Sequence, residues 1–582
     1  MKKKTIKINN AGMSFLINAA FLILVILFCD MKYEVSDDFV MDTVLSGAYG
    51  TDYNEYMLFS NILLGCFLKA LYRLIPVISW YFVYHILICF LSLWAVSYII
   101  FEKNNRYVAV LLSLIFTSFF SDDLYILPQF TKTAAVASVA GGMLFLHGIS
   151  YDYKMLKKVI LALAGGGLAL IGTMTRFSCF YISIAFLGLG FLEVVWIKRK
   201  QLKNIMRIFV SCCMLVVVAY SLRYINSYIW SQNSEYQAYL DYNHIRASVT
   251  DKSSYGYESV QPELEELGIS FNDYAMVETW NFLDQDCFPD ERLEEISKIK
   301  SNYSNIVNHS ILSILKQFVH RGYQKYLTVI GIGVIFLLLV ILEPKKAMWA
   351  VCKLFTTVLI LLYFFYRGRV VYRVEYGILV GLAICLCISF EKQCINPEIK
   401  KAFIYWMCIV CLCKLPLYIP DTSYQTMTDE EYSQYIYDVF YESWNYDIRK
   451  YRCNVTERKP YGNLTDYIEQ DREHFYLLDF SSTIQLIYYN YKPWIRLPIG
   501  YYNNYSYIGG VTTRYPDNLS LWEKQGIDIQ NPYKSIVNDN IYLVDKDFAG
   551  IKFEYIKEKY YPDAKAELID VKDGFNIWKF TK

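Results

Sequence analysis

Residues 15–39 read FLINAAFLILVILFCDMKYEVSDDF, an apolar segment that ends shortly before two adjacent aspartates, Asp37 and Asp38. Four lysines precede this segment: Lys2, Lys3, Lys4 and Lys7. An apolar run with positive charge before it is typical of a membrane-spanning helix that enters from the cytoplasm. The sequence therefore predicts that Asp37 and Asp38 lie at the outer surface of the membrane.

The two aspartates are themselves candidates for chemistry. Like charges side by side repel each other, and beside a low-dielectric surface we expect at least one of the two carboxyls to have a raised pKa. A carboxyl with a raised pKa suits a proton acceptor in catalysis. Taken alone, the pair is equally compatible with a solvated acidic loop.

Composition restricts the class of protein. Of the 582 residues, 55% are hydrophobic, and they come in blocks close to helix-spanning length, which indicates a polytopic membrane protein whose first partner is the lipid bilayer. The net charge of +1 gives no basic field for nucleic acid. Most of the 15 cysteines lie inside apolar runs, so neither a disulfide framework nor a zinc site is predicted. Abundant Tyr, Asn, Ile and Lys suggests a bacterial source, and hence a multi-pass protein of the bacterial plasma membrane.

The distribution of lysine and arginine decides the topology. Segment 57–76 is apolar but carries Asn61, Lys69 and Arg73. If it crossed the membrane, the cluster at 198–200 would face outward, against the positive-inside rule, so we expect 57–76 to lie in the outer interface. The eleven predicted spans are 15–29, 80–101, 107–120, 133–147, 159–174, 177–196, 205–230, 326–342, 347–365, 374–390 and 403–418.

Two polar regions then face outside. The first, 231–324, contains helix-like pieces at 262–267, 272–283 and 290–299, the last with Asp290 as N-cap. The second is the tail 421–582, which opens with a capping box at 428–431 ahead of a helix to about Trp444. Its later elements are predicted as strands at 474–480 and 541–544, a helix at 548–560, and two strands joined across 572–574.

The predicted fold class is therefore mainly α. It is a polytopic transmembrane helix bundle of about eleven spans, with the N-terminus inside and the C-terminus outside. Residues 1–420 form the transmembrane domain, including the extracytoplasmic loop 231–324, and residues 421–582 form a C-terminal extracytoplasmic α/β domain.

Several cations are predicted at the outer face. Arg367, Arg369 and Arg373 fall within seven residues at an outer membrane boundary, Arg176 stands between two spans, and Lys132 follows a further acidic pair. Arginine binds phosphate through two parallel hydrogen bonds, and a lipid-linked phosphate would lie at this depth. Contact with ordinary headgroups or outer carboxylates is the alternative. Secondary candidates are Asp122, Asp123, Glu375, His244, Arg246 and Arg321.

These features together resemble the GT-C superfamily of polyprenyl-phosphosugar-dependent glycosyltransferases. The resemblance covers the first span, the Asp-Asp loop, the interfacial helix leading into a span that begins Trp-Tyr, and an arginine-rich loop before a late span. Residues 367–380 read RGRVVYRVEYGILV, which is similar to the start of a late helix in protein mannosyltransferase and aminoarabinose transferase relatives, with Arg373 at the arginine position. The tyrosine that often follows this arginine is Val374 here.

The resemblance implies a reaction. In such enzymes a carboxylate of the first outer loop, here Asp37 or Asp38, acts as base on an acceptor hydroxyl while the lipid phosphate leaves. The implied donor is a polyprenyl-phosphate sugar, and the acceptor is a cell-surface glycan, a glycolipid or a protein. Basic side chains would neutralise the leaving phosphate, and the candidates are Arg373, Arg369, Arg367, Arg176 and Lys132. Whether a divalent metal assists the carboxylates stays open.

Two other functions are compatible with the outline. A lipid-linked polysaccharide ligase or polymerase would use basic residues and histidine of the loop 231–324, and Asp37 and Asp38 would be expendable. A transporter or flippase of lipid-linked saccharides would be expected to carry midplane charges and broken helices in paired halves. The sequence offers few charges inside its spans and no inverted repeat.

Overall fold

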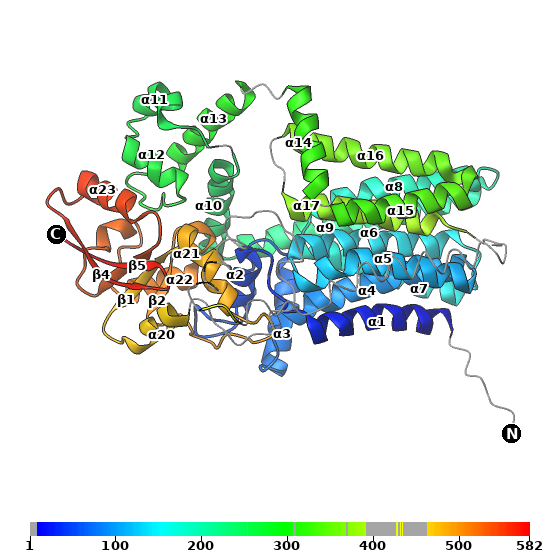
Figure 1. Ribbon diagram of the computed structural model, residues 1–582, viewed down its shortest axis with the longest axis horizontal. Helices are drawn as coiled ribbons and strands as arrows, with labels where there is room; N and C mark the ends of the chain where they lie inside the picture. Colours follow the sequence, from blue (N-terminus) through cyan, green and yellow to red (C-terminus); the bar gives the residue numbers. More distant parts are fainter. Residues whose placement is uncertain are drawn as a thin grey trace.

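The computed structural model describes residues 9–252, 254–306, 310–324, 326–367, 371–391, 426–428, 431, 434 and 462–582. Figure 1 shows two groups of elements: long helices that run side by side, and an assembly of shorter helices with a small sheet at one end of them. The functional candidates of the sequence lie where the two groups meet.

Nine helices of the described residues are long and apolar enough to cross a membrane. They are α1 (Asn10–Phe28), α4 (Trp80–Lys103), α5 (Arg106–Ile126), α6 (Phe130–Ser150), α7 (Met155–Thr175), α8 (Ser178–Ile197), α9 (Leu202–Ser231), α16 (Ala347–Tyr366) and α17 (Tyr372–Ser389). The apolar helix α15 (Tyr326–Leu342) is shorter. Ten of the predicted spans are thus helices. The eleventh, 403–418, lies outside the described residues, and the number of spans and their orientation stay predictions.

Helix α6 is the centre of the bundle, because 94% of its most apolar 18 residues are buried. It packs closely on α7 because both helices carry glycine at the contact. A Cβ added to Gly141 would lie 2.3 Å from the backbone nitrogen of Ala169, and one added to Gly165 would lie 2.3 Å from that of Phe145. Small residues let helices approach closely where no hydrophobic effect drives their association in lipid. Helices α1 and α9, only 17% buried, lie at the periphery.

The predicted interfacial segment forms α3 (Ile62–Leu74). Its 13 residues rise only about 20 Å at 1.5 Å each, less than the roughly 30 Å of a hydrocarbon core. In Figure 1 this helix runs across the direction of the long helices. Lys69 lies 2.5 Å from Glu55, and Arg73 lies 2.5 Å from Asp52, so α3 is held to the loop before it. Its length agrees with the prediction that 57–76 does not span.

The elements described between α9 and α15 are all helices. It holds α10 (Ser234–Thr250), α11 (Tyr257–Glu266), α12 (Phe271–Glu278), α13 (Asp290–Ile306) and α14 (Ile311–Gln324). The three predicted pieces at 262–267, 272–283 and 290–299 coincide with α11, α12 and α13. Asp290 is the first residue of α13, one position later than an N-cap.

The C-terminal region forms a five-stranded sheet in the order β2-β1-β3-β5-β4. The strands are β1 (Phe475–Asp479), β2 (Tyr505–Ile508), β3 (Ile541–Asp545), β4 (Lys565–Lys572) and β5 (Phe575–Thr581). Strand β1 pairs in parallel with β2 and β3, and β5 pairs antiparallel with β3 and β4. The helices of this region are α20 (Gly462–Gln470), α21 (Phe480–Ile487), α22 (Pro516–Lys524) and α23 (Ala549–Lys559).

The predictions for the tail are confirmed in the described part of it. Strands at 474–480 and 541–544, the helix at 548–560 and the hairpin across 572–574 correspond to β1, β3, α23 and β4–β5. Strand β2 was not predicted. The two reciprocal bonds of the capping box are present, from Thr428 N to Glu431 Oε2 and from Glu431 N to Thr428 Oγ1. Most of the predicted helix to Trp444 lies outside the described residues.

The outer loop and the sheet share one apolar core. Polar groups also cross between them. Asn281 donates to Asp479 at 3.0 Å, and the hydroxyls of Tyr555 and Tyr560 donate to Asp284 at 3.0 and 2.8 Å. Burial raises the pKa of Asp284 to about 7, although these hydrogen bonds act in the opposite direction. The loop helices and the sheet are therefore packed as one unit, while the division of the chain at residue 420 stays a prediction.

The charge-based orientation is testable at both ends of α9. Gln201 and Ser231 are exposed at these ends. Single cysteines are introduced there in a chain whose 15 native cysteines are all replaced by serine. We expect a membrane-impermeant maleimide to label Ser231→Cys in intact cells, and to label Gln201→Cys only after permeabilisation. The reverse pattern would mean that 57–76 crosses the membrane.

Candidate functional site

Four helices begin at the place where Asp37 and Asp38 lie. The two aspartates occupy the first turn of α2 (Ser36–Leu45), and α4, α6 and α17 contribute Tyr81, Phe130 and Arg373 from their own first turns. The N-terminal ends of helices carry partial positive charge and unsatisfied N–H groups. These four N-terminal ends favour a carboxylate or a phosphate beside them.

Asp38 is completely buried. Its Oδ1 accepts hydrogen bonds from the hydroxyl of Tyr81 at 3.0 Å and from the backbone nitrogen of Phe130 at 2.9 Å. Burial holds the pKa of this carboxyl well above its usual range, and the two hydrogen bonds offset only part of the shift. Oδ2 has no hydrogen-bond partner among the described residues. Through these two hydrogen bonds Asp38 joins α2 to α4 and α6.

Asp37 lies in a different environment, next to Arg373. The Nη2 atom of Arg373 lies 3.7 Å from Oδ2 of Asp37, and the two side chains are 20% and 21% exposed. The sequence named both residues as candidates, and the structure brings them together from opposite ends of the bundle's sequence. Both side chains of the pair are therefore partly exposed, in contrast to Asp38.

Lys132 is at the centre of a buried ion network. Its ammonium lies 2.5 Å from Glu34 and also pairs with Asp123, whose other oxygen accepts from the hydroxyl of Tyr372. None of the three charged side chains is more than 2% exposed. Burial raises the pKa of Glu34, and the charge of Lys132 opposes that shift. Lys132 therefore ties the first outer loop to α5, α6 and α17, and its ammonium does not reach the surface.

Asp42, one turn further along α2, has three hydroxyl partners. Tyr33 and Tyr72 donate to it at 2.9 and 3.0 Å, and Ser79 donates at 3.4 Å. Burial raises the pKa of Asp42 to about 7, against the effect of these hydrogen bonds. The residue joins α2 to α3 and to the start of α4. The sequence analysis did not find it, because it lacks an acidic neighbour.

Arg176 and Arg321 lie beside the site with partners of their own. Arg176 donates to Thr131 Oγ1 at 2.6 Å and to Ser178 Oγ at 3.1 Å, and its guanidinium lies 4.8 Å from the ring centre of Phe130. It is therefore adjacent to the helix end that Asp38 binds. Arg321 makes a two-pronged pair with Glu375, with Nη2 at 2.8 Å and Nε at 3.2 Å. That pair joins α14 to the first turn of α17.

Arg246, His244 and Asp122 have other surroundings in the described part of the chain. Arg246 is buried against Asn243 and the ring of Trp280, and His244 is exposed on the same helix. Asp122 is buried in the last turn of α5. Arg367 follows α16 directly, and Arg369 lies outside the described residues.

Aromatic residues of the tail cover the first outer loop. Gly500 and Tyr502 donate their backbone N–H groups to the carbonyls of Gly47 and Ala48 at 2.9 Å each. The ring centres of Tyr49 and Tyr502 are 4.4 Å apart. The sequence analysis missed this contact, although the tyrosine-rich stretch 488–507 was a visible signal of an aromatic surface.

Metal binding by the aspartates is not supported by further ligands. Within the described residues, no group of three or more His, Cys, Asp and Glu side chains could hold a metal ion. The predicted metal assistance therefore stays open.

Loss of the buried ammonium tests the structural role of the network. We expect Lys132→Met to lower the free energy of unfolding by about 3–5 kcal/mol, because it leaves two buried carboxylates without a counter-charge. The measurement is unfolding of the purified protein in detergent. Lys69→Met removes a more exposed pair with Glu55 and should cost about 1 kcal/mol or less. Equal losses for the two variants would contradict the central role of Lys132.

The raised pKa of Asp42 predicts a pH dependence of stability. Below about pH 4 the carboxyl is neutral in the folded and unfolded chains, and between about pH 4 and 7 only the unfolded chain ionises it, so this group's contribution falls as pH rises. The difference between a pKa of about 4 in the unfolded chain and about 7 in the folded chain corresponds to about 4 kcal/mol of stability. Asp42→Asn should remove this component of the pH dependence of unfolding, whereas Asp52→Asn, at an exposed position, should keep it. An unchanged pH profile in Asp42→Asn would refute the assignment.

Comparisons with known proteins give no family. No family model matches the chain, and no curated protein matches it. Among solved structures, the chain is similar to the crystal structure of ArnT from Cupriavidus metallidurans bound to undecaprenyl phosphate, with 9% sequence identity, 98% of each chain covered and a TM-score of 0.39. A likeness at this TM-score does not establish a shared fold, so the chemistry of the site is argued from its own residues.

Proposed function

We propose that this chain is a membrane glycosyltransferase that moves a sugar from a polyprenyl-phosphate donor to an acceptor hydroxyl at the outer face of the membrane. The observation that carries the proposal is the partly exposed pair of Asp37 and Arg373. Their Oδ2 and Nη2 atoms are 3.7 Å apart at a point where four helices begin. Glycosyl transfer from a phosphate needs a carboxylate and a phosphate ligand side by side.

Arg373 is proposed to hold the donor phosphate. A phosphate that enters the site can replace Asp37 as the partner of the guanidinium, and it gains the partial positive charge of the helix N-termini. Arg176, against Phe130, extends this positive surface. Lys132 is assigned a positioning role instead, because both of its carboxylate partners are enclosed with it.

Asp37 is proposed as the base. Its carboxylate accepts the proton of the acceptor hydroxyl as the hydroxyl oxygen attacks the anomeric carbon of the sugar. The bond from that carbon to the phosphate oxygen breaks, and the lipid phosphate leaves with the electron pair. The guanidinium of Arg373 stabilises the charge that develops on the leaving oxygen.

Asp38 is proposed to position Asp37 without taking the proton. It is completely buried and holds the first turn of α2 against Tyr81 and Phe130. Asparagine keeps the oxygen that accepts both hydrogen bonds, so Asp38→Asn should be tolerated. This division of roles distinguishes two neighbouring residues that the sequence alone left equivalent.

The test compares lipid-linked saccharides in membranes of cells that carry the intact chain or a variant. We expect Asp37→Asn to lower formation of the glycosylated acceptor by about 100-fold or more, since general-base catalysis typically contributes 10² to 10⁴. A sugar lipid with a single phosphate should accumulate, and its sugar identifies the donor. Asp38→Asn should retain most of the activity.

The matched control is Asp52→Asn, which makes the same change at an exposed residue of the same loop that pairs with Arg73. It should behave as the intact chain. Loss in Asp38→Asn with retention in Asp37→Asn would exchange the two roles. Unchanged saccharides in both variants, at normal protein levels, would contradict glycosyl transfer at this pair and favour a ligase, polymerase or transporter.

A further inference from the structure

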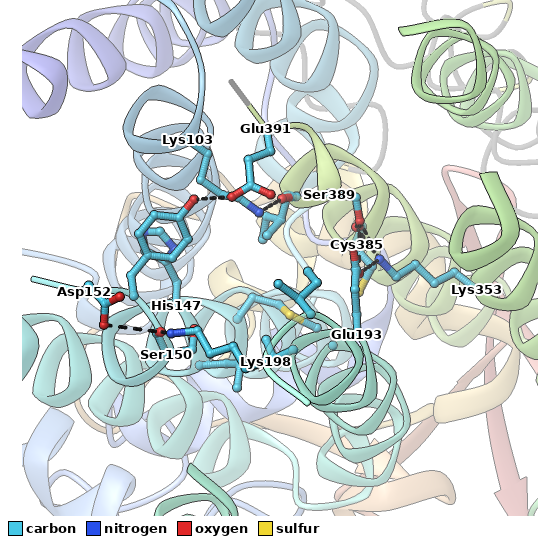
Figure 2. Close-up of a pocket in the computed structure, with 17 residues that line it drawn as sticks. Lys103, His147, Ser150, Asp152, Glu193, Lys198, Lys353, Cys385, Ser389 and Glu391 are labelled. Carbon is cyan, nitrogen blue, oxygen red and sulfur yellow. Dashed lines mark hydrogen bonds and ion pairs between the residues drawn. The ribbon is translucent and has the colours of Figure 1, made fainter. Parts of the chain in front are cut away.

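The end of the bundle opposite to Asp37 contains a cavity of about 420 Å³. Helices α4, α6, α8 and α17 all end around it, and α16 contributes a side of it from its first half (Figure 2). The charge distribution of the sequence predicts that this end faces the cytoplasm. The proposed transfer reaction does not use the cavity.

Lysines surround this cavity and donate to the helix ends. Lys103 reaches the carbonyl of Ile388 at 2.5 Å, and Lys198 reaches that of Ser150 at 2.5 Å. Lys353 donates to the carbonyl of Cys385 at 3.3 Å. The C-terminal ends of helices carry partial negative charge, so ammonium groups are stabilised there. Lys103 and Lys198 each keep N–H groups that one carbonyl does not use, whereas Lys353 also donates to Glu193 and to the hydroxyl of Ser389.

The lysines differ in whether a carboxylate neutralises them. Lys353 lies 2.5 Å from Glu193, and Lys346 lies 3.0 Å from Glu391. No carboxylate lies within ion-pair distance of Lys103 among the described residues. The carboxylate nearest to Lys198 is Asp152 at 3.9 Å, and that side chain is 87% exposed and shared with Lys158. Asp152, Glu193 and Glu391 also line the cavity, but no carboxylate of the described residues accepts a hydrogen bond from Lys103 or Lys198.

The remaining wall is apolar and reaches the surface of the bundle. Met143, Leu146 and Gly190 line the interior, and Ile197, which also lines the cavity, is 58% exposed. An anion bound between Lys103 and Lys198 could thus carry an apolar extension along α8. Basic pockets between helices at the cytoplasmic side are typical sites for the phosphates of lipid headgroups.

We propose that this cavity binds a phosphate group through Lys103 and Lys198, as a second ligand site separate from that of Asp37 and Arg373. Two sources share this chemistry: the headgroup of an anionic phospholipid in the adjacent leaflet, and a soluble phosphate. The two ammonium groups can donate charge-assisted hydrogen bonds to a phosphate. Each has N–H groups that no carboxylate of the described residues accepts.

Binding to the purified full-length chain tests the site. One arm measures radiolabelled phosphatidylglycerol in mixed micelles, and the other measures radiolabelled inorganic phosphate by equilibrium dialysis. The test variant is Lys103→Gln with Lys198→Gln, which removes two charges but keeps a donor for each carbonyl. The control is Arg199→Gln with Lys200→Gln, which removes the same charge from exposed positions beside the cavity.

We expect the test variant to bind phosphatidylglycerol at least tenfold more weakly than the intact chain, with the control unchanged. The same loss confined to inorganic phosphate would support the site and assign it to a soluble ligand. Equal binding by the test variant and its control in both arms would overturn the proposal.

A second variant covers the case in which the double lysine variant fails to fold. Gly190→Leu fills the cavity without a change of charge, and a Cβ at this position meets only the flexible ends of Leu146 and Met143, at 3.1 and 3.2 Å. It should lower binding in the same arm. Binding equal to that of the intact chain would overturn the proposal on its own.

Discussion

The ammonium of Lys132, enclosed with the carboxylates of Glu34 and Asp123, joins the first outer loop to the helices of the bundle. Burying three charges is costly unless each is paired, and removal of one member leaves an uncompensated charge in a low-dielectric region. The hydroxyl of Tyr372 adds α17 to the same network. Since Arg373 is the next residue, the network that fixes the loop also fixes the arginine opposite Asp37. The geometry of the proposed site therefore depends on an interaction that takes no part in the chemistry.

This anchoring places two neighbouring carboxyls in opposite environments. Asp38 is completely buried, and burial raises its pKa, whereas Asp37 is partly exposed beside Arg373. Environments that separate the properties of adjacent titratable groups are a common way to assign acid, base and structural roles. The bundle has a second polar region at its other end, where helix C-termini and lysines meet. Helices α4, α6 and α17 begin beside Asp37 and end around this second region, and charged side chains lie at both of their ends.

Local patterns in the sequence were sufficient for most of the helices and strands. Ten of the predicted spans correspond to helices, and segment 57–76, which the charge of 198–200 predicts not to span, contains the short helix α3. The sequence also selected Asp37 and Arg373, which the fold brings together. The sequence could not reveal that Lys132 forms buried ion pairs with Glu34 and Asp123, because the pair with Glu34 joins segments far apart in the chain. For the same reason the sequence did not predict the hydrogen bonds of Gly500 and Tyr502 to Gly47 and Ala48. It also did not predict that lysines of several helices line one cavity at the opposite end of the bundle from Asp37.

The central claim is that Arg373 and Asp37 form the site of the donor phosphate. The most direct measurement is a structure of the full chain in lipid nanodiscs with undecaprenyl phosphate added. The account predicts phosphate density within hydrogen-bond distance of the Arg373 guanidinium, with Asp37 displaced from its present ion pair and Asp38 still bound to Tyr81 and Phe130. Phosphate density elsewhere, with the pair of Asp37 and Arg373 intact, would contradict it.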